Sequence, residues 1–107
     1  MDIQPKFDAD MTVRSFAYAA KQLATSQASL TPSAQYERIL AEAEKHRSAL
    51  RLVQRDAFEL AEQGLRKQTL TKAEFHQVCE TAVQAVSQGL QAISRIAAQY
   101  APQKLAA

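Results

Sequence analysis

The chain has 107 residues and a formal net charge of +2; 47% of its residues are hydrophobic and 22% are charged. These values are typical of one globular domain, and they exclude wholesale disorder and a polycationic protein. Tryptophan is absent and aromatic residues make up only 7%, so stacking platforms for single-stranded nucleic acid are not expected. The one cysteine, Cys79, has no partner for an intrachain disulfide and is interpreted as a small buried hydrophobe. No stretch is apolar enough to span a membrane or to serve as a secretory signal, so we expect a soluble, cytoplasmic protein without membrane association.

The composition favours long helices. Glycine occurs twice and proline three times, and no run of alternating β-branched residues indicates a strand. The sequence therefore predicts an all-α, bundle-like fold of three helices. We expect a long antiparallel helical hairpin and a shorter N-terminal helix within a single domain that spans residues 1–107.

Residues 1–10, which include Pro5, are expected to form an extended lead-in to the first helix. Asp8, Asp10 or Thr12 can cap this helix, because their side-chain oxygens can accept hydrogen bonds from the unpaired N–H groups of the first turn. The predicted helix covers residues 11–26 and presents one apolar face, formed by Val13, Phe16, Ala20 and Leu23.

The second helix is predicted over residues 32–67. Thr31 is a good N-cap, and Pro32 suits the first helical position, where its missing N–H costs nothing. The apolar stripe of this helix lapses near His46–Ser48, and the sequence leaves open whether the helix continues there. A break at this point would give a compact four-helix monomer.

The third helix is predicted over residues 71–101 and has the clearest start signal in the chain. Thr71 and Glu74 match a capping box, and Leu70 and Phe75 occupy the positions of a hydrophobic staple. Pro102 prevents the helix from continuing, and residues 102–107 are expected to form a frayed tail.

A short connection near residues 68–70 makes the two long helices antiparallel neighbours. Helical-hairpin geometry then pairs residues whose numbers sum to roughly 139, so Leu50 should face Gly89 and Val53 should face Val86. The predicted core consists of Leu50, Val53, Leu60, Val86, Ile93 and Ile96.

At ~1.5 Å per residue the hairpin helices should be about 45–54 Å long, but the first helix only about 24 Å. The first helix should therefore cover about half of the hairpin, and the remaining apolar strip requires a second copy of the chain or a helical protein partner. The third helix has an uncharged polar face beside small residues, a texture typical of interfaces. We predict a homodimer or tight heterocomplex with the partner-binding residues Gln84, Ala85, Gln88, Gly89, Gln91 and Ala92.

Arg47, Arg51 and Arg55 are spaced four residues apart and share one face of the second helix. Such a ridge can contact nucleic-acid phosphates. However, Glu44 and Glu59 lie within one turn of these arginines, which favours a solvated face with ion pairs.

The sequence contains no phosphate-binding glycine loop, nucleophile elbow or metalloprotease motif, so we expect no catalytic residue, metal or cofactor. His46 should be tethered to Glu42 and face Ile93, and His76 with Cys79 offers too few ligands for zinc. The sequence predicts a non-enzymatic protein-binding helical protein of the adaptor, chaperone or inhibitor type. The alternative is a nucleic-acid-associated accessory factor that uses the arginine ridge.

Overall fold

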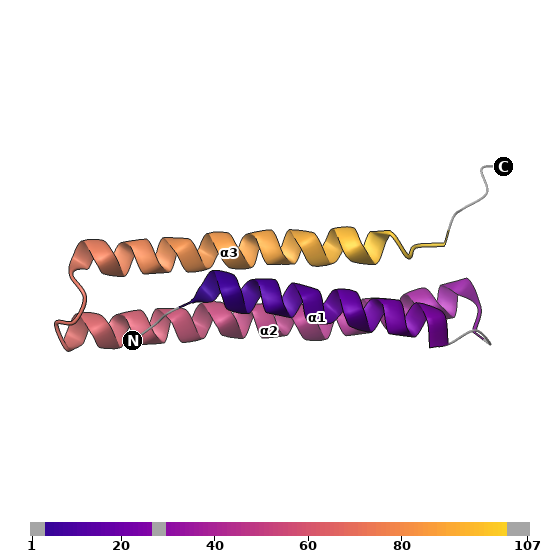
Figure 1. Cartoon of the computed structure of the whole chain (residues 1–107), viewed down its shortest axis with the longest axis horizontal. Helices are drawn as coiled ribbons and strands as arrows, with labels where there is room; N and C mark the ends of the chain where they lie inside the picture. The colour runs from indigo at the N-terminus through magenta and orange to yellow at the C-terminus, as the bar shows by residue number, and fades with distance from the viewer. Residues whose placement is uncertain (1–3, 27–29, 103–107) are drawn as a thin grey trace.

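A computed structural model describes residues 4–26 and 30–102 of the chain. Within these residues the elements are three helices and no strands: α1 (Pro5–Ser26), α2 (Pro32–Arg66) and α3 (Lys72–Ala98). The antiparallel α2 and α3 form the hairpin, and α1 packs against both and runs in the same direction as α3 (Figure 1). The molecule is elongated, with extents of 60 × 27 × 15 Å. The predicted all-α fold of a long hairpin and a shorter N-terminal helix is confirmed.

The start of α1 differs from the sequence prediction. Residues 5–10 were predicted to be extended, but the helix begins at Pro5. Proline fits the first helical position because its missing N–H is not needed there, and the N–H of Asp8 bonds the Gln4 carbonyl at 3.1 Å. Thr12 is not a cap, since its hydroxyl donates to the Asp8 carbonyl inside the helix at 2.8 Å. The first three residues of the expected lead-in lie outside the described residues.

The second helix is continuous from Pro32 to Arg66, so the four-helix alternative with a break near His46–Ser48 is wrong. Its N-terminus is built as predicted: Thr31 Oγ1 accepts from the N–H of Ala34 at 3.1 Å, and Pro32 follows directly. No glycine or proline interrupts the backbone near the lapse in the stripe. The helix continues through this gap in its apolar stripe because polar side chains make the contacts there. His46 packs against α1, and the guanidinium group of Arg47 lies 3.4 Å from the hydroxyl of Ser94 in α3.

The turn between α2 and α3 closes through backbone hydrogen bonds to the end of α2. The N–H of Thr69 donates to the Gly64 carbonyl at 2.9 Å, and the N–H of Gln68 donates to the Leu65 carbonyl at 3.2 Å. This pattern requires a left-handed residue just after the helix, and Gln68 adopts it with φ of 60°. Leu70 folds back over Gly64, where a Cβ atom would lie only 2.7 Å from the Leu70 side chain.

The predicted capping box of α3 is confirmed in both directions. Thr71 Oγ1 accepts from the N–H of Glu74 at 3.1 Å, and Glu74 Oε1 accepts from the N–H of Thr71 at 2.9 Å. The helix ends at Ala98, three residues before the predicted end, and residues 99–101 form a loosened turn before Pro102. Most of the expected frayed tail, residues 103–107, lies outside the described residues.

One hydrophobic core joins all three helices. Phe16, Ile39, Leu50 and Ile93 are its largest fully buried side chains. Of the six predicted core residues, Leu50, Val86 and Ile93 are buried, whereas Val53, Leu60 and Ile96 are half-buried. The predicted pairing of Leu50 with Gly89 is confirmed, because a Cβ atom on Gly89 would lie 3.0 Å from the Leu50 side chain.

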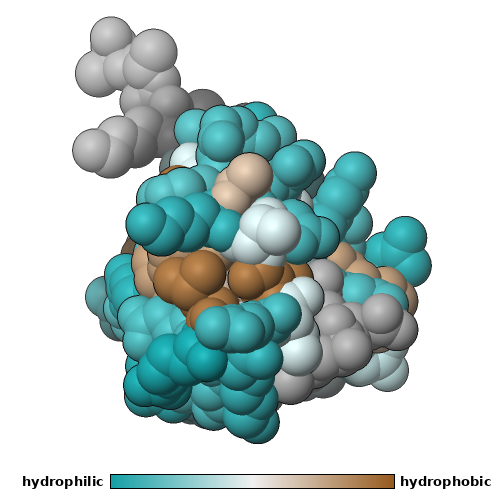
Figure 2. Space-filling view, turned by 90° about the vertical axis from the view of Figure 1, so that its left-hand side faces the viewer, coloured by the Kyte–Doolittle hydropathy of each residue, from teal (hydrophilic) through white to brown (hydrophobic). Residues whose placement is uncertain are grey.

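The end of the hairpin near the α2–α3 turn projects beyond α1. Pro5 lies level with Ala57 and Leu60 of α2, so the last turns of α2 and the first turns of α3 form a two-helix segment. Figure 2, which looks onto this end, shows hydrophobic side chains visible between the two helices. The large apolar residues of this segment are only half-buried: Leu65, Leu70, Phe75 and Val78. The first helix leaves part of the hairpin uncovered, as expected, but with 22 residues against 35 in α2 it covers more than the predicted half.

Candidate interaction surfaces

A shallow groove of about 350 Å³ runs between the parallel helices α1 and α3. Val13, Gly89 and Ala92 are its apolar lining residues. The polar and charged residues of the groove are Asp10, Arg14, Gln88 and Arg95. Towards the N-terminus of α1 it continues, through the shared residue Asp10, into a more apolar depression lined by Pro5, Phe7 and Thr81. We call these two neighbouring depressions together the α1–α3 groove; the first has charged residues beside a small apolar base, and the second is mainly apolar.

The predicted partner-binding strip of α3 is divided by the packing of α1. Ala85 and Gly89 are buried, and a Cβ atom on Gly89 would also lie 3.6 Å from Val13 of α1. Both residues therefore serve the internal packing of the bundle: Ala85 is buried within it, and Gly89 is reached only at the floor of the groove. The remaining residues of the strip stay accessible: Gln84, Gln88 and Gln91 are exposed, and Ala92 is half-buried in the groove.

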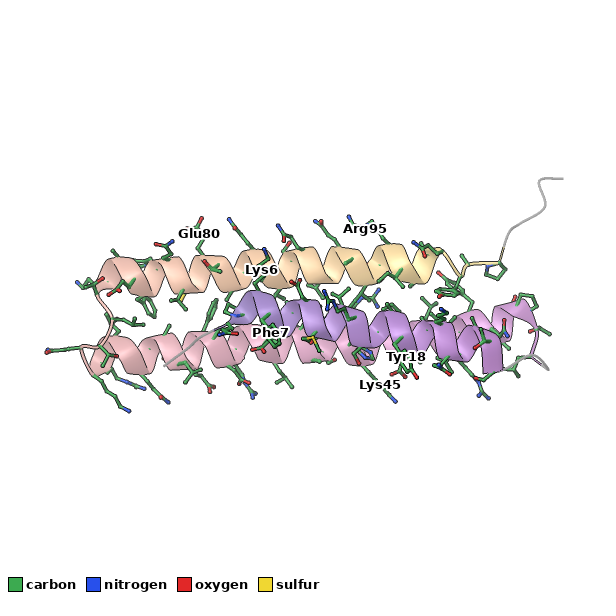
Figure 3. The ribbon with its side chains drawn as sticks, in the orientation of Figure 1. Lys6, Phe7, Tyr18, Lys45, Glu80 and Arg95 are labelled. Carbon is green, nitrogen blue, oxygen red and sulfur yellow. The ribbon has the colours of Figure 1, made fainter. Side chains whose placement is uncertain are left out.

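A second apolar surface, which the sequence prediction missed, lies on the outer face of α1. Phe7, Met11 and Tyr18 are exposed there, and Figure 3 places Phe7 and Tyr18 along the outside of the helix. We call these three residues the α1 stripe. The sequence does indicate this surface, because Met11 follows Phe7 by four residues and Tyr18 follows Met11 by seven, which are helical spacings. It was overlooked because residues 1–10 were interpreted as extended, which left Phe7 outside the helix.

Each arginine of the predicted ridge lies near a carboxylate. Arg47 and Arg51 both approach Glu44, at 3.4 and 3.3 Å, and Arg55 lies 3.8 Å from Glu59. Arg55 also lies 3.7 Å from Asp56. The three arginines share one face as predicted, but the acidic neighbours offset much of the positive field that would attract phosphates.

His46 is half-buried between α1 and α2. Its Nδ1 lies 2.8 Å from the backbone oxygen of Glu42 and 3.7 Å from the Glu42 carboxylate, so the predicted tether is confirmed. Because a carbonyl can only accept, Nδ1 carries the proton in this contact. The predicted orientation towards Ile93 is wrong: the ring packs against Phe16 at 5.5 Å, and Nε2 lies 3.2 Å from Ser15 Oγ. The longer α1 occupies the space that His46 faces.

Cys79 is half-buried in the two-helix segment. Burial, and then the negative charge of Glu62 across the hairpin, raise the pKa of its thiol above the ordinary value. The reactive thiolate is therefore disfavoured, as expected for a packing residue and not for a nucleophile. His76, one turn earlier, is exposed and packs edge-on against Phe75 with the ring centres 5.5 Å apart.

Across residues 4–26 and 30–102, no three histidine, cysteine or acidic side chains converge on a point where a metal ion could bind. In the same part of the chain, no helix combines the length and apolarity needed to cross a bilayer.

Comparisons with known proteins identify no relative. No protein-family model, no curated protein and no solved structure matches the chain. Function is therefore inferred from the surfaces described above.

Proposed function

We propose that this chain is a non-enzymatic protein-binding module of the adaptor, chaperone or inhibitor type that holds a segment of a partner protein in the α1–α3 groove. The observation that carries the proposal is the composition of this groove. Val13 and Ala92 form an apolar base, and the exposed neutral side chains of Gln84 and Gln88 lie along α3. Interfaces combine an apolar centre with polar edges in this way, and they avoid dense charge at the centre.

A helical segment suits this groove better than a compact ligand. The groove and its continuation extend from Thr81 to Arg95 of α3, which corresponds to about 21 Å along the helix. Parallel helices such as α1 and α3 can receive an additional helix between them, as in a four-helix bundle. Because Asp10, Arg14 and Arg95 border the groove, a partner helix with charges of both signs beside its apolar stripe fits this surface.

Site-specific photocrosslinking tests the proposal. A photoreactive phenylalanine analogue replaces Gln88 in the groove, and a matched variant carries it at Glu59 on the charged face of α2. In an extract of the cells that produce the protein, we expect a discrete adduct from position 88 that is absent at position 59. Ala92→Glu should reduce the yield of this adduct at least about tenfold, since it places a charge on the apolar base. Equal adducts at both positions, or none at position 88, would reject the groove as the binding site.

The alternative, a nucleic-acid-associated factor, predicts a different result. A ridge of three arginines that contacts duplex phosphates should lose affinity with a log–log salt slope of roughly −3. Arg51→Ala with Arg55→Ala should remove this binding and leave the crosslink from position 88 unchanged. If the chain fails to retain duplex DNA at low salt, this alternative is rejected without affecting the groove.

A further inference from the structure

Two arginines border the α1–α3 groove from opposite sides. Arg14 belongs to α1 and Arg95 to α3, and both line the depression of about 350 Å³ between these helices. Val13 of α1 packs beside Gly89 of α3, which fixes the level of the two helices. Arg14 is one residue beyond this level and Arg95 six residues beyond it, so they lie about five residues, or ~7.5 Å, apart along the bundle. We call these residues the Arg14–Arg95 pair.

The positive charge of this pair is not neutralised inside the bundle. Both side chains are exposed, and no carboxylate of residues 4–26 and 30–102 forms an ion pair with either of them. Asp10 borders the same depression, so two positive charges face one negative charge there. The outer face of α2 differs, because its arginines lie beside carboxylates, as Arg47 does beside Glu44. The groove therefore keeps a local excess of positive charge.

We propose that the groove recognises a partner helix with an acidic side chain, and that this carboxylate is bound between Arg14 and Arg95. The inference rests on the proposed function and adds to it the sign and the position of the partner's charge. A guanidinium group presents a planar fork of N–H donors that matches the two oxygens of a carboxylate. Two arginines on different helices can hold one carboxylate from two sides.

The apolar base of the groove supports this contact. Val13, Gly89 and Ala92 line the same depression as the two arginines. Because Gly89 and Ala92 are small, a partner helix can approach α3 closely and bring its acidic side chain level with the pair. Apolar side chains packed on this base would exclude water from one side of the ion pair. A partly desolvated ion pair is screened less by salt and solvent than an exposed pair.

The opposite end of the groove does not favour a second carboxylate. Asp10 borders both depressions, and Glu80 directly precedes Thr81, which lines the second one. Lys6 is the cation of that depression. A partner carboxylate beside Asp10 would meet a like charge, which costs free energy. The acidic side chain is therefore expected at the Arg14–Arg95 end alone.

Peptide binding tests the sign of the partner's charge. Three synthetic helices of about 18 residues, long enough to span the groove, share a leucine stripe and have both ends capped. They differ only beside the stripe, where they carry glutamate, glutamine or lysine. Fluorescence anisotropy should rank the affinities in this order, with the glutamate peptide bound at least about threefold more tightly than the glutamine peptide. This advantage should largely disappear at about 1 M salt.

Substitutions test the position of the charge. The double variant Arg14→Gln and Arg95→Gln should bind the glutamate and glutamine peptides equally, because the glutamine peptide never formed the ion pair. Arg66→Gln is the matched control: Arg66 is an exposed arginine of α2 that does not line the groove, and its removal should leave the preference intact. Asp10→Asn should strengthen binding of the glutamate peptide, since it removes the like charge. Far-UV circular dichroism should find the same helix content in all variants.

The outcomes separate this inference from the proposed function. If no peptide binds, if glutamate is not preferred, or if Arg66→Gln removes the preference equally, the inference is overturned. The groove as a protein-binding site still stands in these cases, provided that the photocrosslink from position 88 forms. If the parent chain retains duplex DNA and the double variant does not, the pair recognises phosphates and the acidic-helix inference is wrong.

Discussion

At the scale of single residues, Gln68 has the only positive φ angle recorded outside glycine in the described part of the chain. A residue with a Cβ atom pays roughly 1–2 kcal/mol for the left-handed conformation, which glycine adopts without this strain. Gln68→Gly should therefore raise the free energy of unfolding by about 0.5–1 kcal/mol, after the greater chain entropy of glycine is subtracted. Urea denaturation measures the change. Gln68→Ala keeps the Cβ atom and should give no comparable gain; if it stabilises equally, strain at this position is not the cause.

The raised pKa of Cys79 makes two further effects measurable. Iodoacetamide should alkylate the thiol more slowly in the folded chain than in the urea-unfolded chain at about pH 8, since the thiolate is the reactive form. A raised pKa in the folded state also means that the unfolded chain loses this proton first. The thiol's contribution to stability is therefore present below about pH 8.5 and declines as the pH rises above that value. In Cys79→Ala this component of the pH dependence should be missing, while the remaining titration is unchanged.

At the scale of the helices, the α3 capping box is the local feature with the clearest energetic consequence. Thr71→Ala should lower the free energy of unfolding by about 1 kcal/mol, because the N–H of Glu74 loses its acceptor. Glu74→Ala removes the reciprocal bond to the N–H of Thr71. Because the two side chains cap one turn together, the double variant should cost less than the two single variants added. Strict additivity in thermal melts would mean that the two bonds act independently.

The helix boundaries also explain what could be predicted from the sequence. The starts of α2 and α3 were predictable because Thr31–Pro32 and Thr71–Glu74 are local signals whose hydrogen bonds need no tertiary partner. The start of α1 was not, because Pro5 is compatible with an extended segment and with the first turn of a helix. The burial of Pro5 and Ala9 against the hairpin favours the helix, and this packing cannot be read from the local sequence.

The same limit applies to the candidate surfaces. The sequence shows that one strip of α3 lacks charged residues. It does not show on which side of α3 the first helix packs, because that depends on tertiary contacts. Gly89 was therefore assigned to a partner, although Leu50 and Val13 of the same chain fill the space above it. Because a Cβ atom at this position would already lie 3.0 Å from Leu50, Gly89→Glu should disrupt the fold itself.

At the scale of the whole molecule, stability depends on a core shared by all three helices. Val86 is 3% exposed within this core. Val86→Asp places an unpaired carboxylate there and should unfold the chain at room temperature or lower its melting temperature severely. Val83→Asp, three residues earlier on the same helix, carries the same change at an exposed position and should melt within a few degrees of the parent. If the two variants melt alike, the orientation of α3 in the bundle is wrong.

The two-helix segment at the turn has a consequence for the motions of α2. α2 is one continuous helix of 35 residues, but only the part before about Leu60 packs against α1. Amide hydrogens near Leu50 can exchange with solvent only when the shared core opens, whereas those near Leu65 need only the tip of the hairpin to part. Hydrogen exchange followed by mass spectrometry should therefore find a gradient of protection along this single helix, steepest near Leu60. The apolar side chains between the parted tips would be briefly available to solvent, to chaperones and to proteases long before the chain as a whole unfolds.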